Sequence, residues 1–108
     1  MKKEYRVKKT NEFSDIMKYK KFYASPSFVI YVKPRKEDHP RIGISVGKKM
    51  GNAVVRNKIK RQVRMMVQEI YTFDENFDTI ILVRVKYHEE NYRNNKKVLE
   101  RLVKKVKI

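Results

Sequence analysis

The amino-acid sequence predicts an α+β fold, a single two-layer sandwich in which a mixed sheet of about four strands packs against helices. Segments with apolar residues at every third or fourth position, typical of helices, are separated by short runs of β-branched and aromatic residues, typical of strands. These segments follow in the order helix, two or three strands, helix, strand, helix. The chain has 108 residues without repeats or a linker, so residues 1–108 are expected to form one domain.

A short helix is predicted over residues 10–20, because a residue suited to capping, Thr10 or Asn11, stands beside Glu12. Residues 1–9 before it are a basic arm that we expect to be extended. The sequence Ser-Pro-Ser at residues 25–27 breaks the helix. Three aromatic residues cluster at or beyond the helix end, and we expect them to be mostly core: Tyr19, Phe22 and Tyr23.

Two strands are predicted next, over residues 28–33 and 41–46, joined by a polar connection that lies between two prolines. The first strand has Val29 and Tyr31 opposite a face made of Phe28, Ile30 and Val32. The second strand has an apolar core face and a nearly bare face made of Gly43, Ser45 and, just beyond it, Gly47. Small residues on a strand indicate close approach by another segment or a ligand, or else simple tight packing against a helix, and the sequence leaves both interpretations open.

The last third of the chain predicts one more strand and one more helix. Residues 73–78 are expected to form an acidic loop, and residues 79–85 a strongly apolar strand in the centre of the sheet. A turn at residues 87–91 leads into the final helix, whose lysines point outward. Its buried stripe is expected to contain Tyr92, Leu99, Leu102, Val103 and Val106.

The middle of the chain, residues 51–71, predicts a helix with one apolar face in the core and one positively charged face. Lys48 and Lys49 lie in the turn before it, and Asn52 is suited to cap its first turn. Its apolar residues form one stripe: Val55, Ile59, Val63, Met66, Val67 and Ile70. An adjoining arc carries polar and basic residues: Arg56, Asn57, Lys60, Arg61, Arg64 and Gln68.

The charge pattern around this helix indicates a polyanionic partner. The net charge is +16 and the pI is near 10.1, and no Asp or Glu occurs between Pro40 and Gln68. Arg56, Lys60 and Arg64 follow at intervals of four, where each like-charged pair destabilises a helix by roughly 0.2–0.5 kcal/mol. A merely solvated face normally mixes both signs. An anionic membrane surface is disfavoured, because the helix lacks bulky apolar anchors outside its core stripe.

Groups for protein-based catalysis are scarce in this sequence. The chain has no cysteine, which excludes disulfides and thiolate chemistry. His39 and His88 are isolated and are expected at the surface, and no metal site is expected. Asp74, Glu75 and Asp78 are expected in a solvated loop, without the second carboxylate cluster that a two-metal nuclease needs. No apolar run follows the basic N-terminus, so we expect a cytoplasmic protein with no membrane span.

The run GISVGKKMGNAVVRNKIKRQVR, residues 43–64, resembles the signature of the protein subunit of bacterial ribonuclease P. The hallmark of that family is Arg-Asn-x-x-Lys-Arg-x-x-Arg on a helix, which here begins at Arg56. The N-terminal basic arm, Phe13, the strand of Tyr31 and the later apolar strand also follow the order of the family. The resemblance implies a fold similar to a ribosomal-protein domain, with a left-handed βαβ crossover that departs from the usual handedness.

In that family a catalytic RNA subunit cleaves precursor tRNA with magnesium held by the RNA and substrate, and the protein helps to bind the 5′ leader. The resemblance implies that an RNA-binding set faces the RNA: Lys48, Lys49, Asn52, Arg56, Asn57, Lys60, Arg61 and Arg64. It also implies a leader cleft formed by Phe13, Met17 and Tyr31. Two positions depart from the family pattern, since Met17 stands where a second aromatic is common and Lys20 where a glycine often ends the helix.

Two functions therefore remain on sequence grounds. The first is the accessory subunit of this tRNA 5′-endoribonuclease, with no active site of its own and monomeric without RNA. The second is a structural RNA-binding module such as a ribosomal protein. Composition does not separate them, and the motif at residues 56–64 favours the first.

Overall fold

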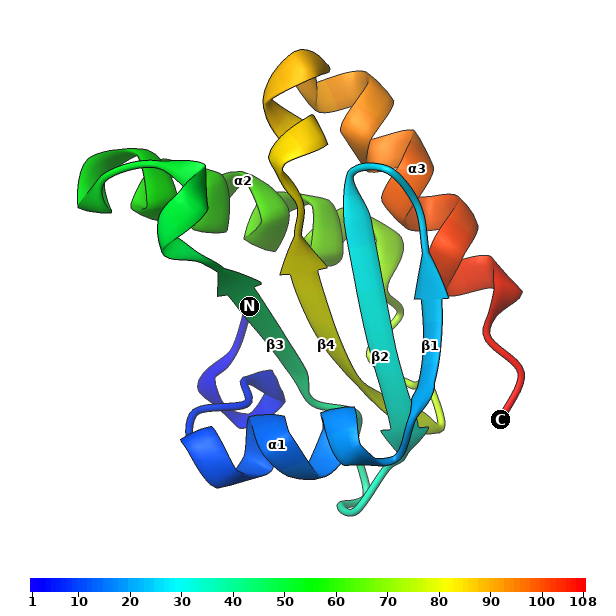
Figure 1. Cartoon of the computed structure of the whole chain (residues 1–108). Helices are drawn as coiled ribbons and strands as arrows, with labels where there is room; N and C mark the ends of the chain where they lie inside the picture. Colours follow the sequence, from blue (N-terminus) through cyan, green and yellow to red (C-terminus); the bar gives the residue numbers. More distant parts are fainter.

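The computed structural model describes residues 1–108 and contains three α-helices and one four-stranded mixed sheet (Figure 1). The α+β class and the predicted order are confirmed, and the strand that the sequence left open is β1. The elements are η1 (Lys3–Tyr5), α1 (Thr10–Lys18), β1 (Lys21–Ala24), β2 (Phe28–Pro34), β3 (Ile42–Val46), η2 (Lys48–Met50), α2 (Ala53–Ile70), β4 (Phe77–Val83), η3 (Val85–Glu89) and α3 (Tyr92–Lys105), where η marks short 3₁₀ helices.

The sheet has the order β1-β2-β4-β3. β2 pairs antiparallel with both β1 and β4, whereas β3 pairs parallel with β4. The parallel pair is joined through α2. In Figure 1, β3 and β4 both point upward, β4 lies to the right of β3, and α2 lies behind the sheet. The crossover is therefore left-handed, against the strong general preference for right-handed connections.

The main core lies between the sheet and the two long helices, α2 and α3. Phe28, Ile30 and Val32 are fully buried on the sheet side, as the alternation along β2 predicts. From the helices come Ile59, Val63, Met66, Val67, Leu99 and Leu102, all at most 4 % exposed. Val55 and Ile70, at the ends of the α2 stripe, are half-buried and pack against this cluster. The predicted core face of α2 is thus confirmed.

The shorter helix α1 lies on the opposite face of the sheet. Its Ile16 joins Val7 and Ile80 in a second, smaller apolar cluster, against which Phe13, Met17 and Tyr31 pack half-buried. Because α1 has only 9 residues, it covers one end of this face and leaves the other end open (Figure 1).

The small residue Gly43 permits the tight fit of α1 on the sheet. A Cβ atom at Gly43 would lie 2.8 Å from both Cζ of Phe13 and Cδ1 of Ile80, closer than real contacts allow. Of the two interpretations of the bare face of β3, packing against a helix is therefore the one observed at this position. No heavy atom lies within 4 Å of a Cβ built at Gly47.

The cap predicted for α2 is present. Oδ1 of Asn52 accepts a hydrogen bond from the backbone N–H of Val55 at 3.0 Å, which satisfies one of the donors left free at the helix start. Asn91 caps α3 in the same way, with 2.8 Å to the N–H of Asn94.

The prediction that the aromatic residues after α1 are mostly core was wrong. Tyr19 is 47 % exposed and Phe22 is 57 % exposed, and only Tyr23 is half-buried. The reason is that residues 21–24 form the edge strand β1, whose alternate side chains face solvent. Residues 25–27 accordingly connect a β-hairpin, and Oγ of Ser25 accepts from the N–H of Phe28 at 3.0 Å.

Two further boundaries differ from the predictions. The N-terminal arm is not simply extended, since residues 3–5 form η1 and Arg6 bridges to Ile42 beside β3. β4 begins at Phe77 instead of residue 79, so Asp78 is a buried strand residue and not a loop acid. Its Oδ1 accepts from the N–H of Arg41 at 2.8 Å. Val85, predicted at the end of this strand, lies in η3 and is 54 % exposed.

The end of α1 carries backbone strain at Lys20. This residue has a φ of 62°, a left-handed conformation that costs a side-chain-bearing residue roughly 1–2 kcal/mol and that glycine adopts freely. We predict that Lys20→Gly raises the free energy of unfolding by about 1 kcal/mol, measured by urea denaturation. Lys20→Ala, which keeps a Cβ, should leave it nearly unchanged, and equal effects of both variants would contradict this account.

Candidate nucleic-acid interface

Basic side chains line one side of α2, as the helical arc predicts. Arg56, Lys60 and Arg64 are half-buried beside the sheet, and Asn57 and Arg61 are exposed further out. Four ion pairs occur in the structure, and none of them involves these residues. The positive charge of this side is therefore not neutralised within the protein.

The turn before α2 adds to the same end of the molecule. Lys48 and Lys49 are exposed in η2, while Met50 between them and α2 is buried. Asn52, also expected to face RNA, has its Oδ1 engaged in the cap, so only its amide group can donate to a partner. The start of α2 adds the positive end of the helix dipole, which favours an anion there.

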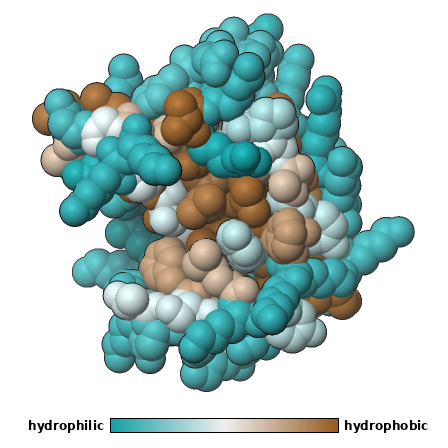
Figure 2. Space-filling view, viewed as in Figure 1, coloured by the Kyte–Doolittle hydropathy of each residue, from teal (hydrophilic) through white to brown (hydrophobic).

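A second predicted set of residues also comes together. Phe13 and Met17 project from α1 and Tyr31 from β2, and all three pack around the same small cluster at one end of the open sheet face. In Figure 2 this face appears as an apolar hollow rimmed by hydrophilic side chains. Residues 10–17 of α1 and residues 28–34 of β2 come together only in the tertiary structure. The pairing of β2 with β4 and the packing of α1 on the sheet bring them side by side.

Phe22 belongs to this cleft, although the sequence analysis assigned it to the core. It pairs with Tyr31 across the β1–β2 hairpin, and the two ring centroids are 5.7 Å apart. Val29, Leu82 and Ser45 continue the same face above them, each half-buried. The aromatic residues Phe22 and Tyr23 just before the turn sequence Ser-Pro-Ser are the signal in the sequence that favours a short strand and a hairpin here.

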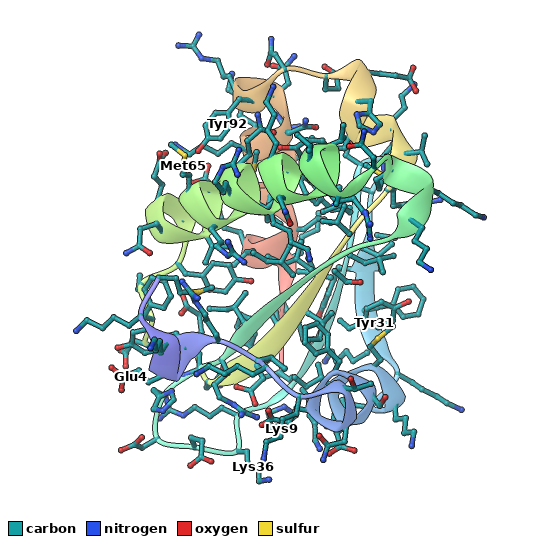
Figure 3. All side chains as sticks on the ribbon, turned by 90° about the vertical axis from the view of Figure 1, so that its left-hand side faces the viewer. Glu4, Lys9, Tyr31, Lys36, Met65 and Tyr92 are labelled. Carbon is teal, nitrogen blue, oxygen red and sulfur yellow. The ribbon has the colours of Figure 1, made fainter.

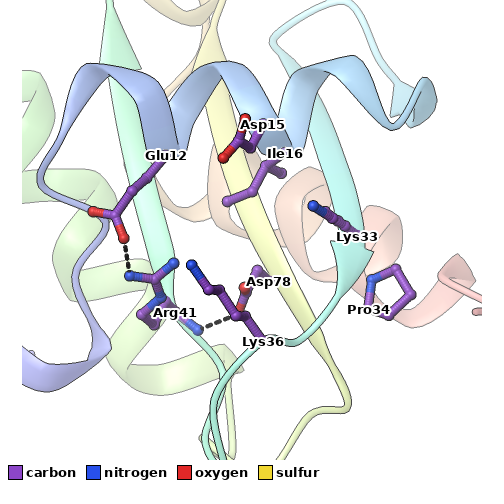
Figure 4. Close-up of a pocket in the computed structure, with 8 residues that line it drawn as sticks. All are labelled: Glu12, Asp15, Ile16, Lys33, Pro34, Lys36, Arg41 and Asp78. Carbon is purple, nitrogen blue, oxygen red and sulfur yellow. Dashed lines mark hydrogen bonds and ion pairs between the residues drawn. The ribbon is translucent and has the colours of Figure 1, made fainter.

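Arg41 does not belong to the free cations, although it lies in the acid-free window of the sequence. Its guanidinium pairs with the carboxylate of Glu12 from α1, in a small polar pocket shown in Figure 4. The hydrogen bond from Arg41 lowers the pKa of Glu12 below its ordinary value. Burial raises the pKa of Asp78 in the same pocket. This network ties α1 to the ends of β3 and β4 and leaves little charge for a ligand.

The structure brings together no group of three or more His, Cys, Asp or Glu side chains that could hold a metal ion. His39 is half-buried, with its ring edge-on to Tyr5 at 5.5 Å. His88 is exposed, and its Nε2 lies 2.8 Å from the carbonyl oxygen of Met50. Glu75 accepts hydrogen bonds from the N–H and the hydroxyl of Thr72. None of the three helices is long and apolar enough to cross a membrane.

An unneutralised basic helix beside an aromatic cleft, on a left-handed α+β fold, defines a nucleic-acid-binding protein. Residues 1–107 match the family model described as Ribonuclease P. The chain therefore belongs to the ribonuclease P protein family.

Individual relatives agree with this assignment along the whole chain. The ribonuclease P protein component of Mycoplasma capricolum is 46 % identical over 111 residues, covering 99 % of this chain and 100 % of the relative. That of Streptococcus agalactiae is 41 % identical over 104 residues, covering 96 % and 95 %. Among solved structures, the RNase P protein of Staphylococcus aureus superposes with a TM-score of 0.84 at 38 % identity, covering 93 % of both chains. The RNase P protein of Thermotoga maritima gives 0.83 at 25 % identity, covering 95 % and 98 %.

The tight contact between Gly43 and Phe13 sets the position of the cleft. We predict that Gly43→Ala displaces the Phe13 ring and lowers the free energy of unfolding by about 1–3 kcal/mol, as overpacking does elsewhere. Urea denaturation measures this loss. Gly47→Ala is the matched control, because its added methyl group meets no other atom within 4 Å. A similar loss of unfolding free energy in Gly47→Ala would indicate that the effect comes from general backbone stiffening and not from the contact with Phe13.

Proposed function

We propose that this chain serves ribonuclease P as its accessory protein by binding two RNA surfaces at once. The basic side of α2 contacts the catalytic RNA subunit and the substrate near the cleavage site. The cleft of Phe13, Met17 and Tyr31 holds the single-stranded 5′ leader of precursor tRNA. The observation that carries this proposal is the adjacency of an unpaired basic helix and an aromatic cleft in one small domain.

The physical logic is that of sequence-tolerant binding to single strands. Aromatic and apolar side chains provide stacking surfaces for bases, while a positively charged groove follows the backbone. Tyr31 and Phe22 provide neighbouring rings, and Met17 packs beside them through a polarisable thioether. A cleft of this kind suits a substrate that is recognised by being single-stranded.

The chemistry is assigned to the catalytic RNA. Hydrolysis of a phosphodiester needs a positioned metal ion or a general base near the reacting phosphorus. In this proposal magnesium is held by the RNA subunit and the substrate, and the purified protein without RNA does not cleave precursor tRNA. The basic side chains reduce repulsion between two RNA molecules, which lowers the magnesium concentration that the reaction needs.

The proposal includes a cytoplasmic location, where precursor tRNA is made, and a protein that is monomeric without RNA. The alternative is a structural RNA-binding module of a larger particle. Dependence of binding on the leader separates the two, since a structural module has no reason to distinguish precursor from mature tRNA.

The aromatic cleft gives the first test of this proposal. Tyr31→Ala should weaken the affinity of the holoenzyme for precursor tRNA with a leader by roughly 1–3 kcal/mol, the usual contribution of one stacked base. Affinity for mature tRNA should hardly change. Tyr31→Phe is the matched control and should bind nearly as the parent does, because it keeps the ring. Equal losses for precursor and mature tRNA would favour the structural module, and urea denaturation checks that Tyr31→Ala remains folded.

The basic helix gives the second test, in which position is separated from charge. Arg61→Ala should weaken binding of the catalytic RNA and reduce processing at low magnesium, whereas Lys105→Ala should change neither. Both residues are exposed and both substitutions remove one positive charge, so thermal unfolding should be nearly the same. Equal effects of the two variants on RNA binding would indicate diffuse attraction without a defined surface.

A further inference from the structure

A hollow of about 100 Å³ lies at the free edge of the sheet, between the N-terminal segment, β3 and α2. Figure 3 looks onto this side of the molecule, with α2 crossing above and the N-terminal segment below. Three of the residues that line it are basic, Arg6, Lys60 and Arg64, and none is acidic. The cations come from two segments more than fifty residues apart in the sequence, so no local motif joins them.

The fold directs Arg6 toward α2. Arg6 forms a parallel bridge with Ile42, and residues paired in this way point to the same face of a sheet. Ile42 is 1 % exposed and belongs to the core cluster beneath α2, so Arg6 lies on the α2 side. The next residue, Val7, is fixed by a 3.1 Å hydrogen bond from its N–H to the carbonyl of Ile42 and is buried under α1.

The charge of this hollow is unbalanced. None of Arg6, Lys60 and Arg64 takes part in an ion pair. Nε of Arg6 is buried and has no hydrogen-bond partner, and a buried donor left unpaired destabilises the folded chain. An oxyanion between the three side chains would supply the missing negative charge.

Other polar hollows of the molecule do not share this property. The pocket in Figure 4 contains Glu12, Asp15 and Asp78 beside its cations. The hollow on the far side of Arg6 contains Glu4, Glu12 and Glu37. A hollow at the other end of the sheet also lacks acids, but it has only two cations, Lys49 and Arg84. Three converging cations without an acid distinguish the edge hollow.

The size and floor of the hollow suit a nucleotide backbone. Its volume of about 100 Å³ is several times the roughly 10–15 Å³ that one water molecule requires. The floor is apolar and includes Phe13, Gly43 and Ile44. Because Phe13 also packs in the leader cleft, the hollow adjoins that cleft, and a strand leaving it toward α2 passes over the three cations.

We propose that Arg6, Lys60 and Arg64 form a phosphate-binding notch that takes one backbone phosphodiester of the RNA leader as it passes from the cleft to α2. Arg6 is thereby an RNA-binding residue outside the helix motif. The notch rests on the proposed function, because it requires a single strand in the cleft. Its ligand is a phosphate oxyanion, and its contacts are independent of base identity.

The test replaces leader phosphates one at a time with neutral methylphosphonates and measures holoenzyme binding of each precursor tRNA. With the parent protein, one position near the cleavage site should lose affinity by about ten-fold, as expected when a charged hydrogen bond is removed. With Arg6→Gln, affinity for the unmodified substrate should be lower by a similar factor, and neutralising that position should have no further effect. The slope of log affinity against log salt should also decrease by about 0.7.

Lys8→Gln is the matched control, since Lys8 is an exposed cation two residues away that does not line the hollow. It should retain the sensitive position. The proposed notch is wrong if every methylphosphonate position behaves alike in the parent and Arg6→Gln proteins. It is also wrong if Arg6→Gln weakens binding of the catalytic RNA but leaves binding of precursor tRNA unchanged. These results would leave the leader dependence of Tyr31→Ala intact, so failure of the notch is distinguishable from failure of the proposed function.

A second measurement keeps the test decisive if Arg6→Gln is poorly folded by urea denaturation. Arg64→Gln acts on the same phosphate from the other side of the hollow, on a helix fixed by its core stripe. The loss of affinity caused by the methylphosphonate at the sensitive position and the loss caused by Arg64→Gln should be strongly non-additive when the two changes are combined. Additive losses for this pair would overturn the notch.

Discussion

The burial of one stripe of α2 against the sheet is the constraint on which the rest of this molecule depends. Ile59, Val63, Met66 and Val67 are between 0 and 3 % exposed, so the helix cannot rotate about its axis without exposing several large apolar groups. That fixed rotation decides where the cations point. The polar arc beginning at Arg56 must therefore face the edge of the sheet and the solvent beyond it, whether or not a partner is present.

The opposite face of the sheet is only partly covered by a helix. α1 spans only one end, held there by the contact of Phe13 with Gly43 and by the ion pair of Glu12 with Arg41. A longer helix would close the face, and a bulkier residue than Gly43 would lift Phe13 away from the strand. The result is an open apolar surface bounded by aromatic rings, which is costly to leave in water and well suited to nucleic-acid bases.

Both features lower the stability of the free protein. Like charges along α2 repel one another, and Nε of Arg6 and Nε of Arg56 are buried without partners. In the proposed function, RNA phosphates provide the anions that this side of the protein lacks, so binding would relieve the repulsion between its cations. None of the four ion pairs within the protein uses a cation of the basic arc on α2, which keeps the basic side available.

The sequence by itself determined the features that depend on local periodicity: the class and order of elements, the two faces of β2, the stripe of α2 and its Asn52 cap. The motif at residues 56–64 further identified the family, and with it the residues of the cleft. Tertiary structure alone decided which distant residues meet. Phe22 faces the cleft because the register of β1 places it opposite Tyr31, Asp78 is buried because β4 begins early, and Arg41 is neutralised by a helix residue 29 positions away. Arg6 joins Lys60 and Arg64 only through a bridge to Ile42, and such pairing between distant segments leaves no periodic trace in a single sequence.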